Sequence, residues 1–378
     1  MRIAILANDK ASFIQPMAEG LARMLVACGA EPVTFLEGLN NLALRQAIDT
    51  GSIRSIAAST LRLRKSRRTF DSFIEDLSGV DAIVVVANVP ISFSKSVFPN
   101  IEVLRQRLPT VPIVNYDLHY LPILDSWARL LLRGEKTKLA GEDIAIFEKG
   151  GFGLERYDWY LMAAVGTELP LPPGPQPYSL IGLDLDDGTL YPDQGDEFRA
   201  LVDFEQNRGD YPRYRKAQLD ALKLAGVQHT VLEGTYTRAE IREIYRRTSI
   251  YLLSSAESFG LPICELQACG AKIFLPNAYW AASHWLGEDL YAEREPQLSP
   301  NFVIYEDDAE KLARRIDEVR ASYDPAKTRA TLEEFQPHLI HGDVTEVKSF
   351  VDRLENGEIH SRLHSQHYPI GRSGNSPV

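Results

Sequence analysis

The chain has 378 residues, of which 44% are hydrophobic and 25% are charged. This composition is close to that of an average soluble globular protein and excludes a fibrous or disordered chain. At about 150 residues per domain, the length indicates two or three domains. The 41 Lys and Arg against 52 Asp and Glu give a net charge of −11. Because phosphate contacts need clustered cations, we expect no nucleic-acid partner.

The length of the apolar runs and the spacing of the cysteines indicate the cellular compartment of the protein. Uninterrupted apolar runs stay well short of the roughly 18 residues of a membrane-spanning helix. The first run, Arg2–Ala7, is too short for the apolar region of a signal peptide. The three cysteines have no metal-ligand spacing and indicate reduced thiols. These features predict a cytoplasmic protein.

In the first half, short apolar runs alternate with helical patterns, which is typical of a parallel sheet covered by helices. We expect a helix over Gln15–Ala27, where apolar residues recur with helical spacing. The expected strands of this half are Arg2–Ala7, Glu31–Leu36, Ala82–Ala87 and Val111–Asn115.

The second half repeats the alternation. Its expected strands are Arg199–Phe204, Gln228–Glu233, Ile250–Leu253 and Lys272–Leu275. Its expected helices are Tyr214–Ala225, Ala239–Arg247, one that starts at Ile263–Ala268, Ala309–Ala321 and Thr345–Leu354. The pattern predicts an α/β protein with two facing doubly wound, Rossmann-like domains.

A proline-rich stretch over Glu168–Pro177 separates the halves. Five prolines in eight positions are incompatible with a helix or a central strand, so we place the domain boundary there. The predicted domains are 1–170 and 171–340, followed by a helix over 341–356 that crosses back to the first domain and a flexible tail over 357–378. In doubly wound sheets, ligands bind beyond the carboxyl ends of the strands, and a cleft between two domains is the natural site.

Two stretches stand out in composition. Residues 54–68 carry six basic residues and no acidic one, which fits either a solvated surface or a docking patch for an anionic acceptor or a membrane surface. The tail carries His360, His364 and His367. Without an accompanying carboxylate or thiol, these histidines indicate a loose tail rather than a metal site.

The chemistry concentrates after the strand expected at Ile250–Leu253. Gly260 permits a tight turn and Pro262 suits the first helical position, so a helix N-terminus is expected there as an anion site for a diphosphate. Glu257 and Glu265 flank this turn. Because an ionised carboxylate accepts hydrogen bonds from a vicinal diol, the layout matches a nucleotide sugar. The alternative is an ordinary strand-to-helix junction.

This segment resembles the E-x7-E signature of retaining glycosyltransferases of the GT-B fold, most closely family 4. The family form E-x-F-G-L-P-x-x-E-A-x-A-x-G aligns with residues 257–270, which read ESFGLPICELQACG. The resemblance implies that Glu257 contacts the transferred sugar and that Glu265 holds the ribose hydroxyls. It also implies that the intervening turn serves the sugar and phosphate through Phe259, Gly260, Leu261 and Pro262.

A second match concerns cations for the donor diphosphate. The family carries an Arg and, five positions later, a Lys after the first strand of its second domain. Arg208 and Arg213 have this spacing, with Arg in place of Lys, which keeps the charge and alters the donor geometry. Arg215 and Lys216 lie nearby, so the assignment can shift, and a salt-bridged surface is the alternative.

In the first domain, the resemblance assigns a role to one residue, His119. His119 follows the run Val111–Asn115 and corresponds to the histidine that the family places beneath the transferred sugar; a core histidine is the alternative. The family has a Gly-Gly loop after its first strand, whereas this chain has Ala7–Ser12 without glycine. This departure favours an unusual acceptor or lost catalysis.

Other motifs fail. The run Asp184–Leu190 invites comparison with the D-x-D-G-T signature of haloacid-dehalogenase-like phosphatases, but alignment of Gly188 and Thr189 places Leu185 at the nucleophile, and leucine cannot form an aspartyl phosphate. No G-x-G-x-x-G follows the first strand, which disfavours a dinucleotide oxidoreductase.

The sequence therefore predicts a glycosyltransferase that moves a sugar from a nucleotide diphosphate sugar to a saccharide, lipid-linked or other acceptor. The resemblance implies retention, no metal and no cofactor besides the donor. A non-catalytic nucleotide-sugar-binding protein, an epimerase and a phosphorylase remain as alternatives. The expected catalytic residues are Glu257, His119, Arg208 and Arg213, and the expected donor-binding residues are Glu265, Phe259, Gly260, Leu261 and Pro262.

Overall fold

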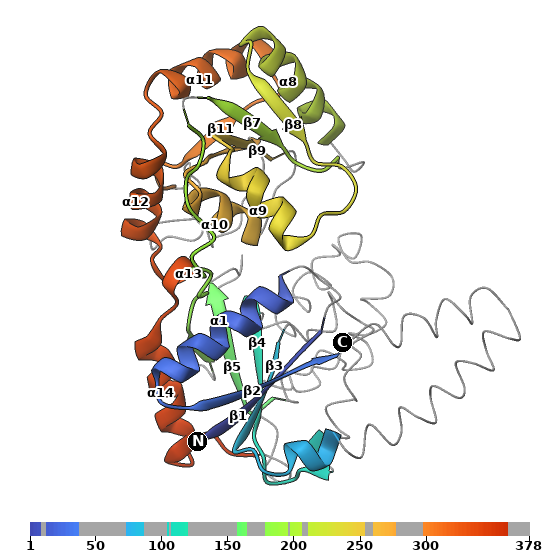
Figure 1. Cartoon of the computed structure of the whole chain (residues 1–378), viewed down its shortest axis with the longest axis vertical. Helices are drawn as coiled ribbons and strands as arrows, with labels where there is room; N and C mark the ends of the chain where they lie inside the picture. The colour runs from blue at the N-terminus through green and yellow to red at the C-terminus, as the bar shows by residue number, and fades with distance from the viewer. Residues whose placement is uncertain are drawn as a thin grey trace, which may run out of the picture. The chain divides into compact units, whose positions relative to one another are not determined.

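The chain forms two compact units in the computed structural model. The structure describes residues 1–8, 13–37, 73–86, 104–105, 107–119, 157–164, 178–195, 197–205, 211–253, 260–276 and 298–361. The chain passes from unit 1 into unit 2 between Ile181 and Gly182 and returns to unit 1 at Asp343. The proline-rich stretch where the boundary was expected, Glu168–Pro177, lies outside the described residues. Each unit is built on its own sheet (Figure 1).

Unit 1 contains a six-stranded sheet with the order β2-β1-β3-β4-β5-β6. Residues Ile3–Leu6 of β1 and Ala82–Val86 of β3 are apolar and fully buried, as expected for a parallel sheet covered by helices. The pairs β1–β2, β1–β3, β3–β4 and β5–β6 are parallel. The strands are β1 (Arg2–Asn8), β2 (Glu31–Glu37), β3 (Ala82–Val86), β4 (Ile113–His119), β5 (Trp159–Ala164) and β6 (Tyr178–Leu180).

Helices α1 (Ile14–Ala27) and α14 (Val344–Glu355) pack against strands of unit 1. Helix α1 covers β1 and β2 with the apolar face that its spacing predicts, including Met17, Leu21 and Met24. Helix α14 starts at Asp343, whose carboxylate accepts from the Glu346 N–H, and it packs against α1 and β6. The helix expected over 345–354 is thus present and lies in unit 1.

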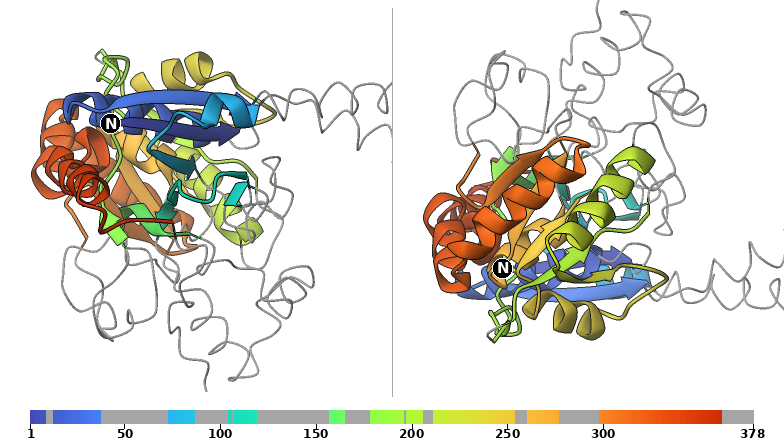
Figure 2. Two further views of the ribbon diagram at one scale, coloured as in Figure 1. Left: turned by 90° about the horizontal axis from the view of Figure 1, so that it is seen from below. Right: turned by 90° about the horizontal axis from the view of Figure 1, so that it is seen from above.

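Unit 2 contains a five-stranded sheet with the order β11-β10-β9-β7-β8, in which every neighbouring pair is parallel. The strands are β7 (Arg199–Val202), β8 (Gln228–Val231), β9 (Ile250–Leu252), β10 (Lys272–Pro276) and β11 (Phe302–Tyr305). The helices are α8 (Tyr211–Leu224), α9 (Arg238–Arg246), α10 (Leu261–Ala268), α11 (Ala309–Ala321), α12 (Pro325–Phe335) and α13 (His338–His341). Helices α8 and α11 cover one face of this sheet, and α9 and α10 cover the other (Figures 1 and 2).

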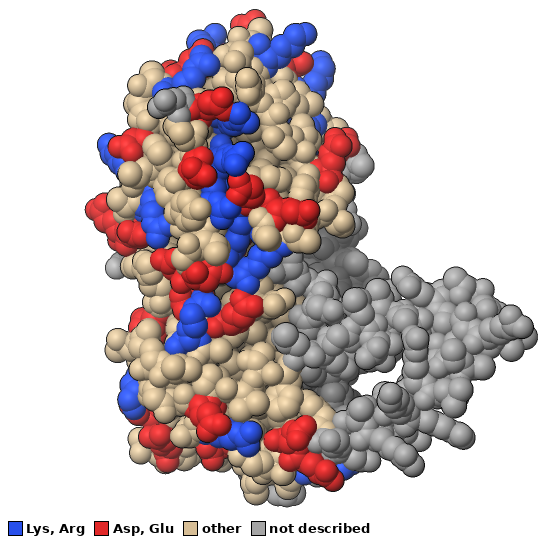
Figure 3. All heavy atoms as spheres, viewed as in Figure 1, with Lys and Arg blue, Asp and Glu red and all other residues tan. Residues whose placement is uncertain are grey.

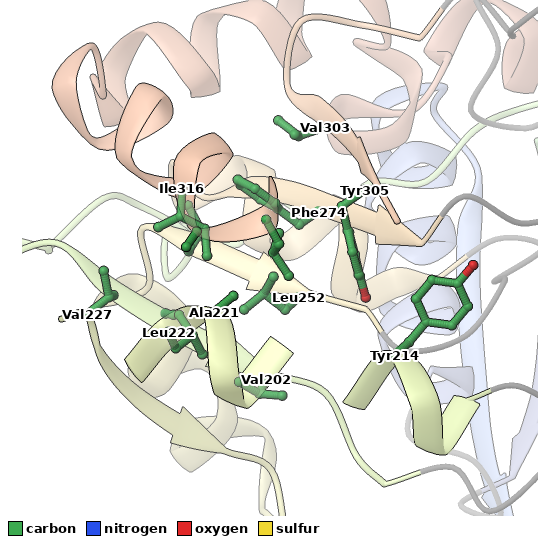
Figure 4. Packing of buried hydrophobic residues seen from close by; sticks show 14 residues of the cluster. Val202, Tyr214, Ala221, Leu222, Val227, Leu252, Phe274, Val303, Tyr305 and Ile316 are labelled. Carbon is green, nitrogen blue, oxygen red and sulfur yellow. The ribbon is translucent and has the colours of Figure 1, made fainter. Parts of the chain in front are cut away.

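The core of unit 2 lies between the sheet and the pair α8–α11. Strand residues such as Leu252 and Phe274 pack against Leu222 of α8 and Ile316 of α11 (Figure 4). The ring of Tyr305 borders this core and meets the ring of Tyr214 edge to face, with 5.8 Å between their centroids.

The strand order of unit 2 defines a switch point. From β7 the chain moves outward to β8 and then returns to β9 on the other side of β7. The connections that leave β7 and β9 therefore diverge to opposite faces of the sheet. In doubly wound sheets, ligands bind beyond the carboxyl ends of the strands at such a point. The residues that directly follow the two strands are Asp203 and Leu253.

Two helix starts differ from the sequence expectation. Helix α10 begins at Leu261, so Pro262 is its second residue rather than its first; the proline is tolerated there because the first helical N–H groups have no partner in the helix. Helix α8 begins at Tyr211, three residues before the expected start. Arg213 therefore lies within the first turn of α8 rather than in the loop that precedes it.

The chain enters unit 2 through a tight backbone contact. Gly182 has φ +68°, and a Cβ atom built on it would lie 2.0 Å from the carbonyl oxygen of His338. The N–H of Leu183 donates to that oxygen at 2.7 Å. The run Asp184–Leu190 thus forms the loop after the entry into unit 2.

Two general features complete the picture. Among the described residues, no helix combines the length and the apolar character that crossing a bilayer requires. On the face drawn in Figure 3, acidic and basic side chains are interspersed over unit 2, where ion pairs such as Arg315–Glu318 and Arg320–Asp317 join neighbouring turns of α11.

Candidate functional site

The N-terminus of α10 follows strand β9 at the switch point of unit 2. Its N-cap is Gly260, which is extended (φ −120°, ψ 123°) and offers no side chain to the helix. The carbonyl oxygen of Gly260 accepts from the N–H of Ile263 at 3.0 Å. The first N–H groups of a helix have no intrahelical acceptor, so this end is suited to an anion.

Glu265 lies on the next turn of α10 and is 7% exposed. Its Oε1 atom accepts two hydrogen bonds from the guanidinium of Arg242 on α9, from Nε at 3.1 Å and from Nη2 at 2.5 Å. Among the described residues, none donates to its second oxygen, Oε2. The carboxylate is thus anchored through one oxygen only.

Arg242 is 3% exposed and has further acceptors on the entry loop. Its Nη1 donates to Asp187 Oδ2 at 2.5 Å and to Thr189 Oγ1 at 2.7 Å. Burial alone would lower the pKa of Arg242, but the charge of Glu265 and the bonds to Glu265 and Asp187 outweigh it and raise the pKa. The guanidinium therefore stays charged between two carboxylates.

Asp187 is held in place by its own turn. Its Oδ1 accepts from the N–H of Thr189 at 3.1 Å and from the Thr189 hydroxyl at 2.7 Å, while Gly188 takes φ +78°. Burial opposes ionisation, but the bonds from Thr189 and Arg242 dominate and lower the pKa of Asp187 to about 2. The Asp-Gly-Thr sequence thus builds a turn that presents a permanent anion to Arg242. We call Arg242, Glu265, Asp187 and Thr189 the α9–α10 cluster.

A second buried arginine lies at the switch point itself. Arg215 of α8 is 9% exposed, and its Nη2 donates to the carbonyl oxygen of Asp203 directly after β7. Within the described part of the chain, its Nε and Nη1 atoms are buried and have no hydrogen-bond partner. An unpaired buried guanidinium is costly, so this group is suited to an anionic ligand that supplies acceptors.

The surroundings of Arg215 are ordered by hydrogen bonds across the strand ends. Gln218 donates from Nε2 to the Leu253 carbonyl at 2.8 Å and to the Tyr305 hydroxyl at 2.5 Å. Tyr305 in turn donates to the Leu253 carbonyl at 2.5 Å. Burial raises the pKa of Asp203 against bonds from Tyr251 and Phe204 and against the charge of Arg215. We call Arg215, Gln218, Asp203 and Tyr305 the switch-point cluster.

Arg213, the second cation of the sequence prediction, has a different environment. It pairs with Asp307 at 2.6 Å, its side chain is 55% exposed, and its guanidinium lies 5.6 Å from the centre of the Tyr214 ring. The Arg213–Asp307 ion pair agrees with the alternative interpretation, in which this arginine is part of a salt-bridged surface. Its predicted role in binding diphosphate stays a prediction.

Three predicted site residues, Glu257, Phe259 and Arg208, lie outside the described residues. For His119 the structure gives the backbone only, at the end of β4 in unit 1. Gly260, Leu261 and Pro262 form the start of α10, as described above.

Unit 1 also places polar side chains along β4. Asn115 and Asp117 are two residues apart and share one face of the strand. The amide of Asn115 is buried, and neither its oxygen nor its nitrogen has a hydrogen-bond partner within the described residues. Burial raises the pKa of Asp117 to about 7, against the hydrogen bond that its carboxylate accepts from the Leu118 N–H. A carboxyl group with a pKa near neutral pH thus lies at the carboxyl end of a central strand.

Sequence reasoning missed Arg242 as a site residue and named Arg215 only as a neighbour of the predicted pair. Both lie on helices without a motif. One signal was present for Arg242: it occupies the buried face of α9 together with Tyr245, a face where an apolar residue is the norm. For the described residues, no group of three or more His, Cys, Asp and Glu has the geometry of a metal site.

Comparison with known proteins gives the fold. No protein-family model matches the sequence, and no curated protein matches it. The catalytic domain of starch synthase IV from Arabidopsis thaliana, solved with ADP and acarbose, is similar with a TM-score of 0.53 and 10% identity, over 95% of this chain and 99% of that one. LpCGTa in complex with UDP is similar with a TM-score of 0.51 and 13% identity, over 94% and 99% of the two chains.

These similarities and the strand topology define the class of fold. The chain consists of two parallel-sheet α/β domains with the GT-B fold of glycosyltransferases, as the sequence predicted. At such low identity the comparison carries the fold alone.

Proposed function

We propose that this protein is a glycosyltransferase that takes a sugar from a nucleotide diphosphate sugar bound by unit 2. The observation that carries the proposal is the buried Arg215 guanidinium at the switch point, which keeps two N–H groups without acceptors among the described residues. A diphosphate supplies both the charge and the oxygen atoms that these groups lack. The N-terminus of α10 adds a second source of positive potential for the same anion.

The proposed chemistry is transfer with retention and without a metal. Departure of the nucleoside diphosphate leaves an oxocarbenium-like sugar, and the charge that develops on the leaving phosphate is stabilised by Arg215 and by the α10 N-terminus. In this proposal Glu257 contacts the transferred sugar, Glu265 accepts from the ribose, and Arg208 and Arg213 add positive charge at the diphosphate. His119 of unit 1 contacts the sugar. The acceptor is a saccharide, a lipid-linked sugar or another hydroxyl compound.

The test begins with ligands. Thermal shift with the diphosphates of uridine, guanosine, adenosine and thymidine and with their sugars identifies the donor, because a ligand at 100 times its dissociation constant adds about 2.7 kcal/mol of stability. Stabilisation by one nucleotide family is expected. If none of these compounds stabilises the protein, the proposal is wrong.

The assignment of the cation is then tested with matched variants. Replacement of Arg215 by Met keeps the length and removes the charge, and we expect diphosphate affinity to fall by about 1.5–3 kcal/mol, roughly 10- to 100-fold, with a smaller effect on the monophosphate. Arg213→Met tests the cation that the sequence resemblance assigns to the diphosphate. Arg315→Met on α11 is the control for the loss of an exposed, paired arginine. Equal losses for mono- and diphosphate with Arg215→Met contradict the assignment.

The non-catalytic alternative rests on the first-strand loop Ala7–Ser12, which lacks the Gly-Gly of family 4. A hydrolysis and transfer assay with the donor found by thermal shift separates the two functions. Turnover supports the transferase. Affinity without turnover, across saccharide and lipid-linked acceptors, supports a nucleotide-sugar-binding protein on the same fold.

A further inference from the structure

We propose that Arg242 is a positioning residue of the donor site, which fixes the Glu265 carboxylate so that Oε2 is presented to the ribose hydroxyls. This inference rests on the proposed function and adds a residue that the sequence motif does not contain. It follows from the way in which the hydrogen bonds of the α9–α10 cluster are distributed.

The two bonds from Arg242 reach the same oxygen of Glu265, Oε1. They fix the rotation of the carboxylate, because Nε and Nη2 are held in one plane by the guanidinium. Oε2 then keeps its capacity to accept, and among the described residues no donor uses it. A carboxylate that is fixed in this way loses little rotational freedom when it binds a hydroxyl, so its affinity and its selectivity both increase.

Arg242 is itself held from the other side. Its Nη1 is shared between Asp187 Oδ2 and Thr189 Oγ1, and the turn at Gly188 fixes both acceptors. The chain of contacts thus runs from the entry loop through α9 to the second turn of α10. Every link is a hydrogen bond or ion pair within unit 2, and the links become more buried from the entry loop toward Glu265. Such support is what holds a binding group in its productive orientation.

Helix α9 also supplies a matched control. Arg238 lies one turn before Arg242 and donates to the same Oδ2 of Asp187 at 2.9 Å, but no hydrogen bond to Glu265 is found for it within the described residues. A change at Arg238 therefore perturbs the same loop and the same helix and leaves the Glu265 anchor in place. A merely structural role of the cluster predicts similar effects at both positions.

The experiment measures selectivity for ribose over 2′-deoxyribose. Dissociation constants are determined by calorimetry for uridine, guanosine and adenosine diphosphates and for their 2′-deoxy forms. In the wild type we expect the preferred nucleotide to bind about tenfold or more tightly than its deoxy form, the scale of one hydrogen bond to a charged group. Arg242→Lys keeps the charge and removes the planar fork, and we expect the ratio to fall below about threefold. Arg238→Lys is expected to keep the wild-type ratio.

The outcomes separate this inference from the proposed function. If Glu265→Ala loses the ribose preference and Arg242→Lys retains it, Arg242 is not a positioning residue, although the donor site stands. If the wild type shows no ribose preference, Oε2 does not meet the 2′-hydroxyl and the inference is wrong. If no nucleoside diphosphate binds, the proposed function itself fails. Melting temperatures of all variants identify a loss of folding, and Arg242→Gln gives a second reading of the ratio.

Discussion

The two buried arginines of unit 2 differ in how their charge is satisfied. Arg242 donates to two carboxylates and a hydroxyl, whereas Arg215 donates to one backbone carbonyl and, within the described residues, keeps two N–H groups unpaired. Burial is similar, so the difference lies in the partners. A guanidinium surrounded by acceptors stabilises the fold and orients its partners, while one without them is prepared for an anion that comes from outside.

The largest expected effect on stability comes from removal of the paired arginine, Arg242. Arg242→Leu leaves the buried Glu265 carboxylate without its cation, while Asp187 keeps Arg238, and we expect the free energy of unfolding to fall by about 3–5 kcal/mol. Urea denaturation measures this loss. Arg315→Leu removes an exposed ion pair of α11 and is expected to cost less than about 1 kcal/mol. A loss of that small size for Arg242 as well would mean that the cluster does not stabilise unit 2.

Asp117 of unit 1 sharpens the comparison, because its pKa is raised by burial and, within the described residues, no charged group is among the causes. With its pKa raised to about 7, the Asp117 carboxyl group of the folded protein keeps a proton that the unfolded chain releases near the ordinary pKa of 3.8. This group's contribution to stability therefore falls as pH rises from about 4 to about 7.

Asp117→Asn removes that dependence. We expect its advantage in unfolding free energy over the wild type to grow by about 2 kcal/mol between pH 5 and pH 8, from roughly 1.4 kcal/mol per pKa unit reduced for partial exposure. The measurement is urea denaturation at both pH values, with Asp317→Asn on the exposed face of α11 as the control. A pH-independent difference would contradict the raised pKa.

The smallest expected effect has the opposite sign to that of Arg242. Arg215→Met removes a buried group with two unpaired donors, so the free energy of unfolding of the ligand-free protein is expected to rise by about 1 kcal/mol. Urea denaturation without nucleotide measures it. A fall comparable to that of Arg242→Leu would show that Arg215 supports the fold, and its proposed role at the diphosphate would lose its main argument.

Several elements were predictable because a local pattern determines them. Helix α11 has the same bounds as its expected range, since its apolar residues recur with helical period and Asp308 caps it. Strands β1, β3 and β9 are short apolar runs that are buried on both faces. The elements that escaped prediction include β5, a run of six residues whose lack of alternation fits helix or strand, the strands β6 and β11, and the helices α12 and α13.

By itself, the amino-acid sequence determined the α/β class and the two-domain organisation, because these depend on periodicity. The donor-binding role of residues 257–270 comes from a resemblance and stays a prediction. Only the tertiary structure decided which charged groups meet. Arg242 reaches Glu265 and Asp187 across 23 and 55 positions, and Arg215 is buried where α8 packs over the end of β7 at Asp203. Pairing over such separations depends on packing, which no local pattern records.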